Sequence, residues 1–339
     1  MSFITINKQN FFHNLDICSK QANGKDKIAI VLKDNAYGHG LIQIASLANQ
    51  YGLTKAVVQN YQEAQKIEKY FTQLLILADT DIPTYSHKFH ITINNIEDIE
   101  KLPQNCKIHI KIDTGMHRNG INLNQLESAV LRALNKKLQI CGVFTHHKSA
   151  DLFTSDFFYQ NSLFKEIKDK MNKLCEKLSL GKIQFHSCNS AALFRTDNFT
   201  EDFARIGIAA YGYSCNQAPL FKPDLKPILS LYANKISTRL LKKGQSVGYG
   251  GNFTAPQDMQ ISTYDIGYGD GFARLPQDKI YYTKDNEQIL GNISMDNLSV
   301  HSTQDTICIF DDATKLANLH NTIVYEILTP LRIQNILIK

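Results

Sequence analysis

Eight short apolar runs in the first two thirds of the chain constrain its fold most strongly. They lie at 27–32, 55–58, 73–77, 90–93, 107–112, 139–145, 182–185 and 203–209. Amphipathic stretches typical of helices lie between them at 41–50, 61–70, 123–134 and 157–178. Because parallel strands buried on both faces read as near-continuous apolar runs, eight such units predict a closed (β/α)8 barrel of the TIM type. An open doubly wound sheet would give a similar pattern, so that alternative stays open at this point, with the barrel favoured.

The character of the sequence changes near residue 226. Strand-like runs follow at 230–240, 259–266, 280–283, 287–295 and 306–310, with turn residues between them. Long helical patterns are absent until Tyr325. We therefore predict two domains, a barrel over residues 1–225 and a β-rich domain over 226–339. The first few residues are candidates for pairing with the second domain.

Composition and charge narrow the class of protein. The 339 residues are 43% hydrophobic and 20% charged, which excludes a disordered chain. Lys and Arg total 37 against 32 Asp and Glu, and the net charge of +5 is spread without a long basic run, so we expect no nucleic-acid partner.

Cysteine usage and the N-terminus predict a location. The cysteines number seven, and no two form a Cys-x-x-Cys pair, which is typical of reduced thiols in a cytoplasmic protein. The first residues do not read as a signal peptide. No apolar run approaches the roughly 20 residues that a membrane helix needs. We therefore expect a cytoplasmic protein with no membrane partner.

In a barrel of this kind, reactive residues lie at the C-terminal ends of the strands. The first apolar run ends at Lys33, which is followed by a glycine-containing segment, 34–40. A lysine here either extends to the surface along its aliphatic stem or is a desolvated amine suited to a Schiff base with a carbonyl cofactor. Position alone gives the two interpretations about equal weight.

Polar residues also follow four later strand ends. They are 111–120 with Lys111 and Arg118, 145–147 with His146, 186–192 with Ser190, and 205–208 with Arg205, Gly207 and Ile208. The first segment could equally be a structural ion-pair network. Adjacent histidines point in different directions, and no Asp, Glu or His partner stands at metal-ligand spacing, so we predict no metal site. Gly207 could offer its backbone N–H to a phosphate, as the last strands of such barrels often do.

The β-rich region adds three segments: 247–250 around Tyr249, 267–271 with Tyr268, and 294–297 with Met295. Tyrosines flanked by glycines are common in plain hairpins, so one such segment alone would mean little.

Taken together, these segments resemble those of the alanine racemases, a family of pyridoxal-phosphate enzymes of fold type III. The similar blocks, in family order, are LKDNAYGHG, KIDTGMHRNGI, GVFTHH, HSCNSAAL, RIGIAAYG, SVGYGGNFTA, DIGYGDGFARL and GNISMDN. One block such as GYGDG would be a weak match, but eight in the right order and spacing are a strong one, and they cover nearly the whole chain. The family's fold, a barrel followed by a β-rich domain, agrees with the pattern of apolar runs.

The resemblance implies a function. The chain is expected to use pyridoxal 5′-phosphate to interconvert L-alanine and D-alanine, supplying D-alanine for peptidoglycan, and to form a homodimer with shared active sites. Lys33 would carry the cofactor and act as one base, and Tyr249 of the partner chain would be the second. Two bases on opposite faces are required because the Cα proton leaves one face and returns on the other.

The resemblance also assigns the residues around cofactor and substrate. Those expected to hold the cofactor, besides Lys33, are Tyr37, His146, Ser190, Arg205, Gly207 and Ile208. Arg205 would contact the pyridine nitrogen with His146 behind it, and the others would hold the phosphate. The residues expected near the substrate are Arg118, Met295 and Tyr268. Lys111 matches a position that is often carbamylated in the family.

One departure concerns the C-terminus, where the family often has a tyrosine that reaches the phosphate and borders the substrate. The matching place here holds Leu337, to within one residue, which predicts a looser side-chain pocket. Three other functions stay open: a racemase with shifted preference, for serine for instance; a non-catalytic cofactor-binding barrel; and a basic-amino-acid decarboxylase. The domain that carries Tyr249 disfavours the second, and Arg205 in place of an acidic partner of the pyridine nitrogen disfavours the third.

Overall fold

The structure is a computed structural model that describes all 339 residues, and its internal contacts divide the chain into two compact units. The barrel unit comprises Phe12–Asp34 and Ile44–Lys226. The β-rich unit comprises Met1–Phe11, Asn35–Gln43 and Pro227–Lys339. The short segment directly after Lys33 and Asp34 therefore belongs, by its contacts, to the β-rich unit.

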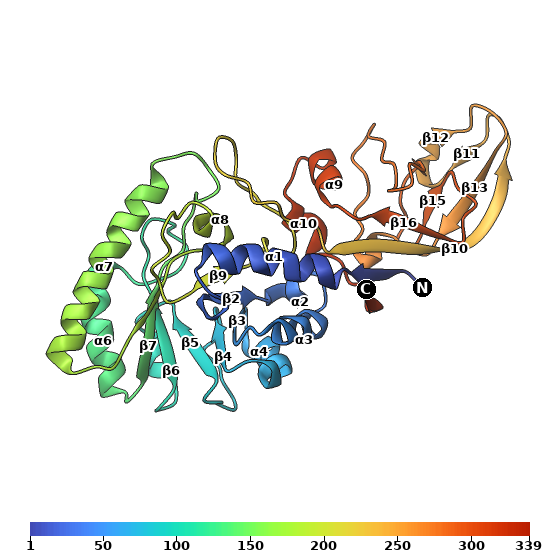
Figure 1. Cartoon of the computed structure of the whole chain (residues 1–339). Coiled ribbons are helices and arrows are strands. Elements are labelled where there is room, and N and C mark those ends of the chain that lie inside the picture. Colours follow the sequence, from blue (N-terminus) through green and yellow to red (C-terminus); the bar gives the residue numbers. More distant parts are fainter. The chain divides into compact units, whose positions relative to one another are not determined.

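The barrel unit is built on one sheet of eight parallel strands (Figure 1). They are β2 (Ile28–Val31), β3 (Lys55–Val58), β4 (Gln73–Ile76), β5 (Phe89–Ile93), β6 (Lys107–Lys111), β7 (Gln139–Phe144), β8 (Gln184–His186) and β9 (Ala204–Ile206). They are paired in the order β8-β7-β6-β5-β4-β3-β2-β9. At the two outer strands, Asp202 N–H donates to Phe185 O at 3.1 Å and Arg205 N–H donates to Cys188 O at 2.9 Å. The sheet is therefore a nearly closed barrel rather than an open sheet.

Burial on both faces explains why the sequence marks these strands so clearly. Every residue of β2, β4 and β5 is buried, as expected for strands covered by helices outside and filled by side chains inside. The longer helices are α1 (Lys8–Gln21), α3 (Leu41–Tyr51), α4 (Tyr61–Ile67), α6 (Leu126–Asn135) and α7 (Asp156–Leu178). The short ones are α5 (Asp98–Lys101) and α8 (Ser190–Leu193). All eight predicted strands and all four predicted helical stretches are present, although the run 203–209 is a strand only at β9 and the run 182–185 is shifted to β8.

The β-rich unit contains a seven-stranded sheet and a two-stranded hairpin. The strands are β1 (Phe3–Ile6), β10 (Leu229–Leu241), β11 (Ser246–Val247), β12 (Phe253–Thr254), β13 (Met259–Tyr264), β14 (Ile289–Leu290), β15 (Leu298–Val300), β16 (Thr306–Phe310) and β17 (Ile336–Ile338). The long β10 is central, because β1, β13 and β16 all pair with it in antiparallel fashion. β17 pairs in parallel with β1. Two short helices, α9 (Thr314–Leu319) and α10 (Val324–Leu328), precede that last strand.

Two strand predictions in this unit are wrong, one altogether and one in extent. Residues 280–283 form no strand and make one isolated bridge, between Tyr282 and Gln288. The chain reverses there, with Asn286 at φ 62° and Thr283 N–H donating to Glu287 O at 2.9 Å. The run 287–295 is a strand only at β14, because Gly291, at φ 66°, turns the chain.

None of the helices has both the length and the apolar character needed to cross a bilayer. All seven cysteines are free thiols.

Candidate active site

Lys33 lies at the C-terminal edge of the barrel. It follows β2 and is the first residue of α2 (Lys33–Tyr37). Its side chain is 36% exposed, and its Nζ lies 3.8 Å from the Asp34 carboxylate. Because β2 pairs with β9, with Ile30 opposite Ile206, Lys33 and the segment after Arg205 emerge at neighbouring strand ends.

The turn that follows Lys33 has a left-handed backbone. Asp34, Asn35, Ala36 and Tyr37 have φ values of 54°, 54°, 54° and 55°. For residues other than glycine this conformation costs roughly 1–2 kcal/mol each, although Asp and Asn tolerate it better. Asn35 compensates locally, since its Oδ1 accepts the N–H of Leu41 at 2.9 Å and so caps α3. Strained backbone of this kind concentrates at functional sites, which agrees with the interpretation of Lys33 as a reactive residue.

Ser190 and the residues after β9 form a small polar cradle. Ser190 is 7% exposed and begins α8, which Asn189 caps through its side chain. Ser190 Oγ accepts the N–H of Gly207 at 3.0 Å and that of Ala209 at 3.4 Å, so its own O–H is left to donate. The N–H of Ile208 has no acceptor in the protein. Two donors are therefore available here to an anion.

Arg205 is buried, only 4% exposed, and the charge of Glu201 acts on it without forming an ion pair. Carbonyl oxygens surround it instead: Nη1 donates to His186 O at 2.8 Å, and Nη2 donates to Thr145 O at 2.7 Å and Ser187 O at 3.0 Å. Nη1 also donates to His186 Nδ1 at 2.7 Å. Nε is the one guanidinium nitrogen without an acceptor. Burial lowers the pKa of Arg205 to about 10, so it remains a cation at neutral pH.

Lys111 ends β6 and is 8% exposed. Its Nζ has no hydrogen-bonding partner and lies 6.0 Å from the centre of the Phe144 ring. Burial, together with the positive charges of Arg118 and Arg205, lowers the pKa of Lys111 to about 8. Arg118 itself is exposed. No ion pair joins Asp113 to Lys111 or Arg118, and the ion pair of this segment links Asp113 Oδ2 to His117 Nδ1 at 3.1 Å.

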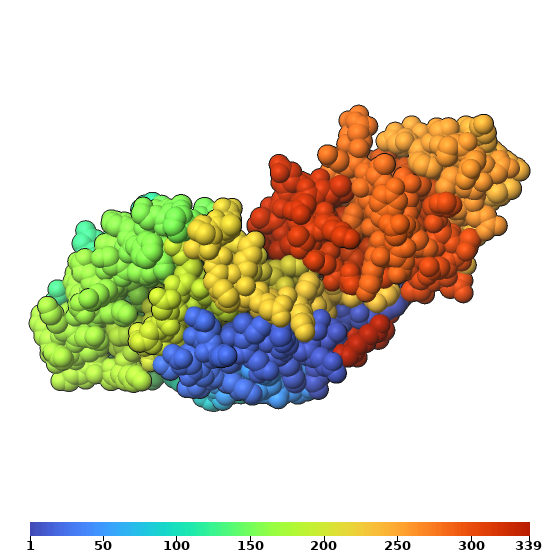
Figure 2. Space-filling view, turned by 45° about the horizontal axis from the view of Figure 1, so that its top comes forward, coloured from blue at the N-terminus to red at the C-terminus, as the bar shows by residue number.

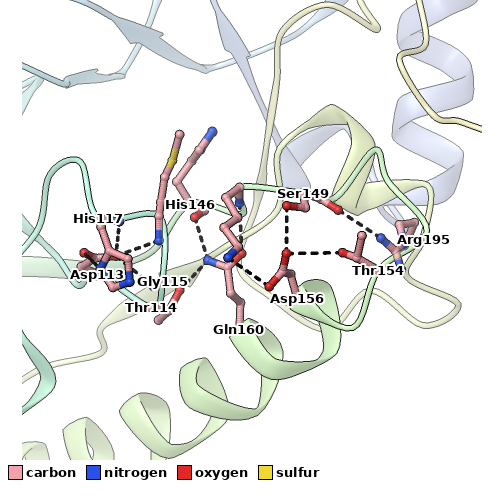
Figure 3. A network of polar contacts seen from close by, with 12 residues as sticks. Asp113, Thr114, Gly115, His117, His146, Ser149, Thr154, Asp156, Gln160 and Arg195 are labelled. Atoms are coloured by element: carbon pink, nitrogen blue, oxygen red, sulfur yellow. Dashed lines mark hydrogen bonds and ion pairs between the residues drawn. The ribbon is translucent and has the colours of Figure 1, made fainter.

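The acid nearest to these cations along the chain is already engaged. Asp113 Oδ1 accepts the N–H groups of Gly115 at 2.9 Å, Met116 at 3.0 Å and His117 at 3.1 Å (Figure 3). Burial alone would raise the pKa of the Asp113 carboxyl, but these hydrogen bonds and His117 hold it below its usual range. Asp113 thus folds the loop after β6. Lys33, Lys111, Arg118 and Arg205 leave this end of the barrel attractive to anions.

Gln160 on α7 holds the loops after β6 and β7 together, and sequence reasoning missed it. Its side chain is 1% exposed. Nε2 donates to Thr114 Oγ1 at 3.0 Å and His146 O at 3.1 Å, and Oε1 accepts the N–H of Lys148 at 3.0 Å (Figure 3). A signal was present, because Gln160 interrupts an apolar stripe made by Phe157, Phe164, Ile167, Met171 and Leu174. A polar residue at such a position usually has a buried partner.

His146 and His147 have different surroundings. His146 Nδ1 lies 3.4 Å from Arg205 Nη2. The pKa of His146 lies well below its usual range because of burial and the charge of Arg205, so its ring is neutral. The His147 ring packs at 5.1 Å from that of Phe157, and neither of its nitrogens has a partner. No three His, Cys, Asp or Glu side chains are grouped to hold a metal ion.

The β-rich unit brings the other three candidate residues onto neighbouring loops. Tyr249 follows β11, and its carbonyl accepts from Asn292 Nδ2 at 2.8 Å. Three residues further on, Met295 O accepts the N–H of Gly269 at 2.8 Å, directly after Tyr268. The three side chains are 68% (Tyr249), 56% (Met295) and 41% (Tyr268) exposed. The segment around residues 240–260, in orange, lies at the surface in the space-filling view (Figure 2).

The C-terminal strand places Leu337 and its neighbour differently. Leu337 stands opposite Thr5 in the pairing of β17 with β1, and its side chain is 45% exposed. Ile336 packs against Gly40 instead, since a Cβ atom built on Gly40 would lie 2.4 Å from Ile336 Cδ1. Gly40 follows Tyr37 closely, and the Tyr37 ring packs 5.6 Å from that of Tyr325. Within the one-residue margin of the sequence comparison, Ile336 is therefore the residue that packs on the segment 35–43 of its own unit, at Gly40.

The fold and the barrel mouth define a (β/α)8 protein with a lysine, a buried arginine and an anion cradle at its strand ends, followed by a β-rich unit. Residues 6–215 match the N-terminal domain of alanine racemase, and residues 228–336 match its C-terminal domain. The chain belongs to the alanine racemase family.

Individual relatives support the same family assignment. The chain is 45% identical to the alanine racemase of Nitratiruptor sp. over 331 residues, 98% of this chain and 97% of the relative. Its fold is similar to that of the alanine racemase of Clostridium difficile 630, with a TM-score of 0.87, 24% identity and coverage of 100% and 96%. It is also similar to the alanine racemase of Bartonella henselae with covalently bound pyridoxal phosphate, with a TM-score of 0.80, 23% identity and coverage of 100% and 99%. At these identities the two structures support the fold alone.

Proposed function

We propose that the chain is a racemase that interconverts L-alanine and D-alanine with pyridoxal 5′-phosphate and supplies D-alanine for peptidoglycan. The observation that carries the proposal is Arg205, a buried cation with four N–H groups engaged by the protein and one, on Nε, left over. An arginine can only donate, so this N–H suits an unprotonated ring nitrogen of the cofactor. An acidic residue there would favour a protonated ring instead.

The other residues at the barrel mouth fit the same cofactor. Ser190 O–H and Ile208 N–H are free to donate to its phosphate, with Gly207 supporting Ser190, and the family resemblance adds Tyr37. Lys33 Nζ would bind the aldehyde carbon. His146, held neutral beside Arg205, adds no charge behind the ring. Arg118 would lie near the phenolic oxygen.

Racemisation then needs two groups that move a proton at one carbon. When bound, the cofactor withdraws electrons from the substrate Cα and makes its proton acidic. Lys33 Nζ would exchange that proton on one face, and the hydroxyl of Tyr249 would do so on the opposite face. With the cofactor bound, Arg205 would disfavour a proton on the ring nitrogen, because two positive charges would adjoin. This would limit the electron withdrawal and restrain side reactions such as transamination.

We propose that Tyr249 acts from a second copy of the chain in a homodimer. The exposure of Tyr249, Met295 and Tyr268 supports this, because large side chains grouped on one surface are typical of an interface. Met295 would bind the substrate carboxylate through its backbone, and Tyr268 would shape the entry to the site.

The test begins with the holoenzyme. Purified protein should be yellow, should racemise alanine fastest within a panel of amino acids, and should show weaker activity on serine. Borohydride reduction followed by peptide mapping should fix the cofactor on Lys33. A label on Lys111, or a preference for a large or charged amino acid, would overturn the proposal.

The shared site has its own test. Mixing Lys33→Ala and Tyr249→Phe chains should restore part of the activity, because one site of each mixed dimer then has both bases. Failure to restore activity when mixed dimers have formed would sink the shared-site proposal and leave the cofactor assignment standing.

A further inference from the structure

Three histidines form a hydrogen-bonded line through the interior of the barrel. His186 Nε2 lies 2.9 Å from His109 Nδ1, and His109 Nε2 lies 2.9 Å from His90 Nδ1. The three are 0% (His186), 0% (His109) and 7% (His90) exposed. The line starts at Arg205, whose Nη1 lies 2.7 Å from His186 Nδ1. We call these three residues the histidine line.

The backbone of β7 makes room for this line. In the sheet, β7 lies between β6, which carries His109, and β8, which carries His186. A Cβ atom at Gly142 of β7 would lie 2.2 Å from His109 Nδ1, so any other residue there would block the contact. The pairing of β6 with β7 also shifts register here: Ile108 stands opposite Ile140 and His109 opposite Gly142, so Cys141 is bulged. Bulges of this kind re-aim side chains near functional sites.

Aromatic packing fixes the plane of the first ring. His186 is stacked between Phe144, at 4.6 Å and 13°, and Phe203, at 4.2 Å and 24°. The Phe144 ring also lies 5.0 Å from the guanidinium carbon of Arg205. The ring of His186 is thus held in the orientation that presents Nδ1 to Arg205 and Nε2 to His109.

The arginine fixes the protonation of every ring in the line. Because a guanidinium has no acceptor, His186 Nδ1 must be unprotonated, and its proton is on Nε2. His186 Nε2–H then donates to His109 Nδ1, which in turn puts the proton of His109 on Nε2. The same step places the proton of His90 on Nε2.

The surrounding charges favour three neutral rings. Burial lowers the pKa of all three histidines, and the positive charge of Arg205 adds to this for His109 and His186. The charged group nearest the far end, Lys107, acts on His90 in the same sense. A second proton on any ring would set one N–H against another and break the line.

We propose that His109 and His90 are positioning residues for Arg205. They hold His186 as the Nε2–H tautomer, which keeps Nδ1 an acceptor and fixes the guanidinium with Nε–H as its remaining donor. Hydrogen bonds in such a chain strengthen one another, so the effect of His90 reaches Arg205 through two other rings. The consequence for catalysis rests on the function proposed above, whereas the tautomers do not.

The first test reads the tautomers in the wild-type holoenzyme. In protein labelled with ¹⁵N-histidine, long-range ¹H–¹⁵N spectra should show His186, His109 and His90 as neutral Nε2–H tautomers with slowly exchanging protons. His109→Phe keeps a ring of similar size and removes both nitrogens, so His186 Nε2–H should exchange faster. His147→Phe is the matched control, because that buried histidine has no hydrogen bond to lose. A proton on Nδ1 of His186 or His109 in the wild type would overturn the proposal.

The second test reads the consequence for Arg205. His109→Phe should lower kcat for alanine by about tenfold, the scale on which outer hydrogen-bond partners of a site matter, with KM little changed. It should also raise the ratio of pyruvate released, with the amino group left on the cofactor, to racemisation turnovers. His90→Phe should change kcat and the ratio in the same direction but by less, and His147→Phe should leave the ratio unchanged. An unchanged ratio in a folded His109→Phe protein would refute the positioning role. A wild type that lacks racemase activity but shows the predicted tautomers would refute only the function.

Discussion

The Gln160 side chain donates to Thr114 Oγ1 at 3.0 Å, which ties the N-terminal part of α7 to the loop that carries Arg118. Thr114 Oγ1 in turn lies 2.7 Å from Thr145 Oγ1, at the end of the next strand. The loops after β6 and β7 are therefore joined through one buried amide and two hydroxyls. Their relative placement depends on a helix that directly follows the second loop and whose Gln160 lies 46 residues from Thr114 in the first.

Gln160→Met should destabilise the barrel mouth, because it keeps the volume but leaves His146 O and Lys148 N–H without partners. Each buried polar group left unpaired costs about 1–3 kcal/mol. We expect a lower free energy of unfolding and faster cofactor release in dialysis. Ser162→Met, at an exposed position on the same helix, is the control and should change neither. Equal cofactor retention in the two variants would show that Gln160 does not hold the site.

Lys111 should be carbamylated in bicarbonate. The pKa of about 8 makes half of the amine neutral near pH 8, and the neutral amine adds to CO2 to form a carbamate with loss of a proton. The negative carbamate would turn the repulsion by Arg118 and Arg205 into attraction. At fixed bicarbonate, a ¹³C carbamate signal should rise with pH and level off above about pH 8. Lys111→Gln should abolish it, and an unmodified amine throughout would refute the assignment.

Without bicarbonate, Lys111 should make stability depend on pH. Its pKa is lowered on folding from 10.5 to about 8, so the unfolded chain binds this proton more tightly. The free energy of unfolding should therefore rise as the pH goes from about 8 to 10.5. Lys111→Met removes the buried charge, so its free energy of unfolding should exceed that of the wild type most below pH 8. If the difference in the free energy of unfolding between wild type and variant did not change with pH, the lowered pKa of Lys111 would be contradicted.

The barrel could be predicted from sequence because its signal is local. Runs such as 73–77 are apolar throughout, since β4 is buried on both faces. The site residues could be predicted only within the segments that resemble those of the alanine racemase family. The histidine line and Gln160 depend on contacts between residues distant in sequence, such as His109 and His186, and on a bulge at Cys141 that apolar periodicity does not show. The left-handed turn could not be predicted from the sequence, because Ala36 and Tyr37 do not favour positive φ by themselves.

Asn35→Ala should destabilise that turn. Asn35 tolerates its φ of 54° better than alanine does, and its Oδ1 accepts the N–H of Leu41 at 2.9 Å. Loss of such a cap costs about 1 kcal/mol, and the strain of alanine at positive φ adds to it. Amide hydrogen exchange at Leu41 should speed up. Asn35→Asp keeps an acceptor and the tolerance of positive φ, so it should stay close to the wild type. Equal exchange in both variants would mean that the side chain does not cap α3.

Substituting Ile336 and Leu337 by alanine, one at a time, should separate the roles of their side chains. Strand alternation puts the side chains of Ile336 and Leu337 on opposite faces, and the one that packs on Gly40 belongs to Ile336. Ile336→Ala should remove that contact at a cost of about 1–2 kcal/mol, less than the cost at a fully buried site. The backbone at Gly40 should then exchange faster. Because this segment carries Tyr37, we also expect faster cofactor loss.

Leu337→Ala is the matched comparison, since it removes a branched side chain that is 45% exposed. It should leave cofactor loss and the serine-to-alanine ratio of kcat/KM unchanged. Cofactor loss that responds to Leu337→Ala and not to Ile336→Ala would reverse the assignment and place Leu337 beside the phosphate. The same pair of variants tests substrate range, because a looser pocket beside Ile336 should raise the serine-to-alanine ratio. A methylene in an apolar pocket is worth about 1–3 kcal/mol of discrimination, so the expected rise is measurable.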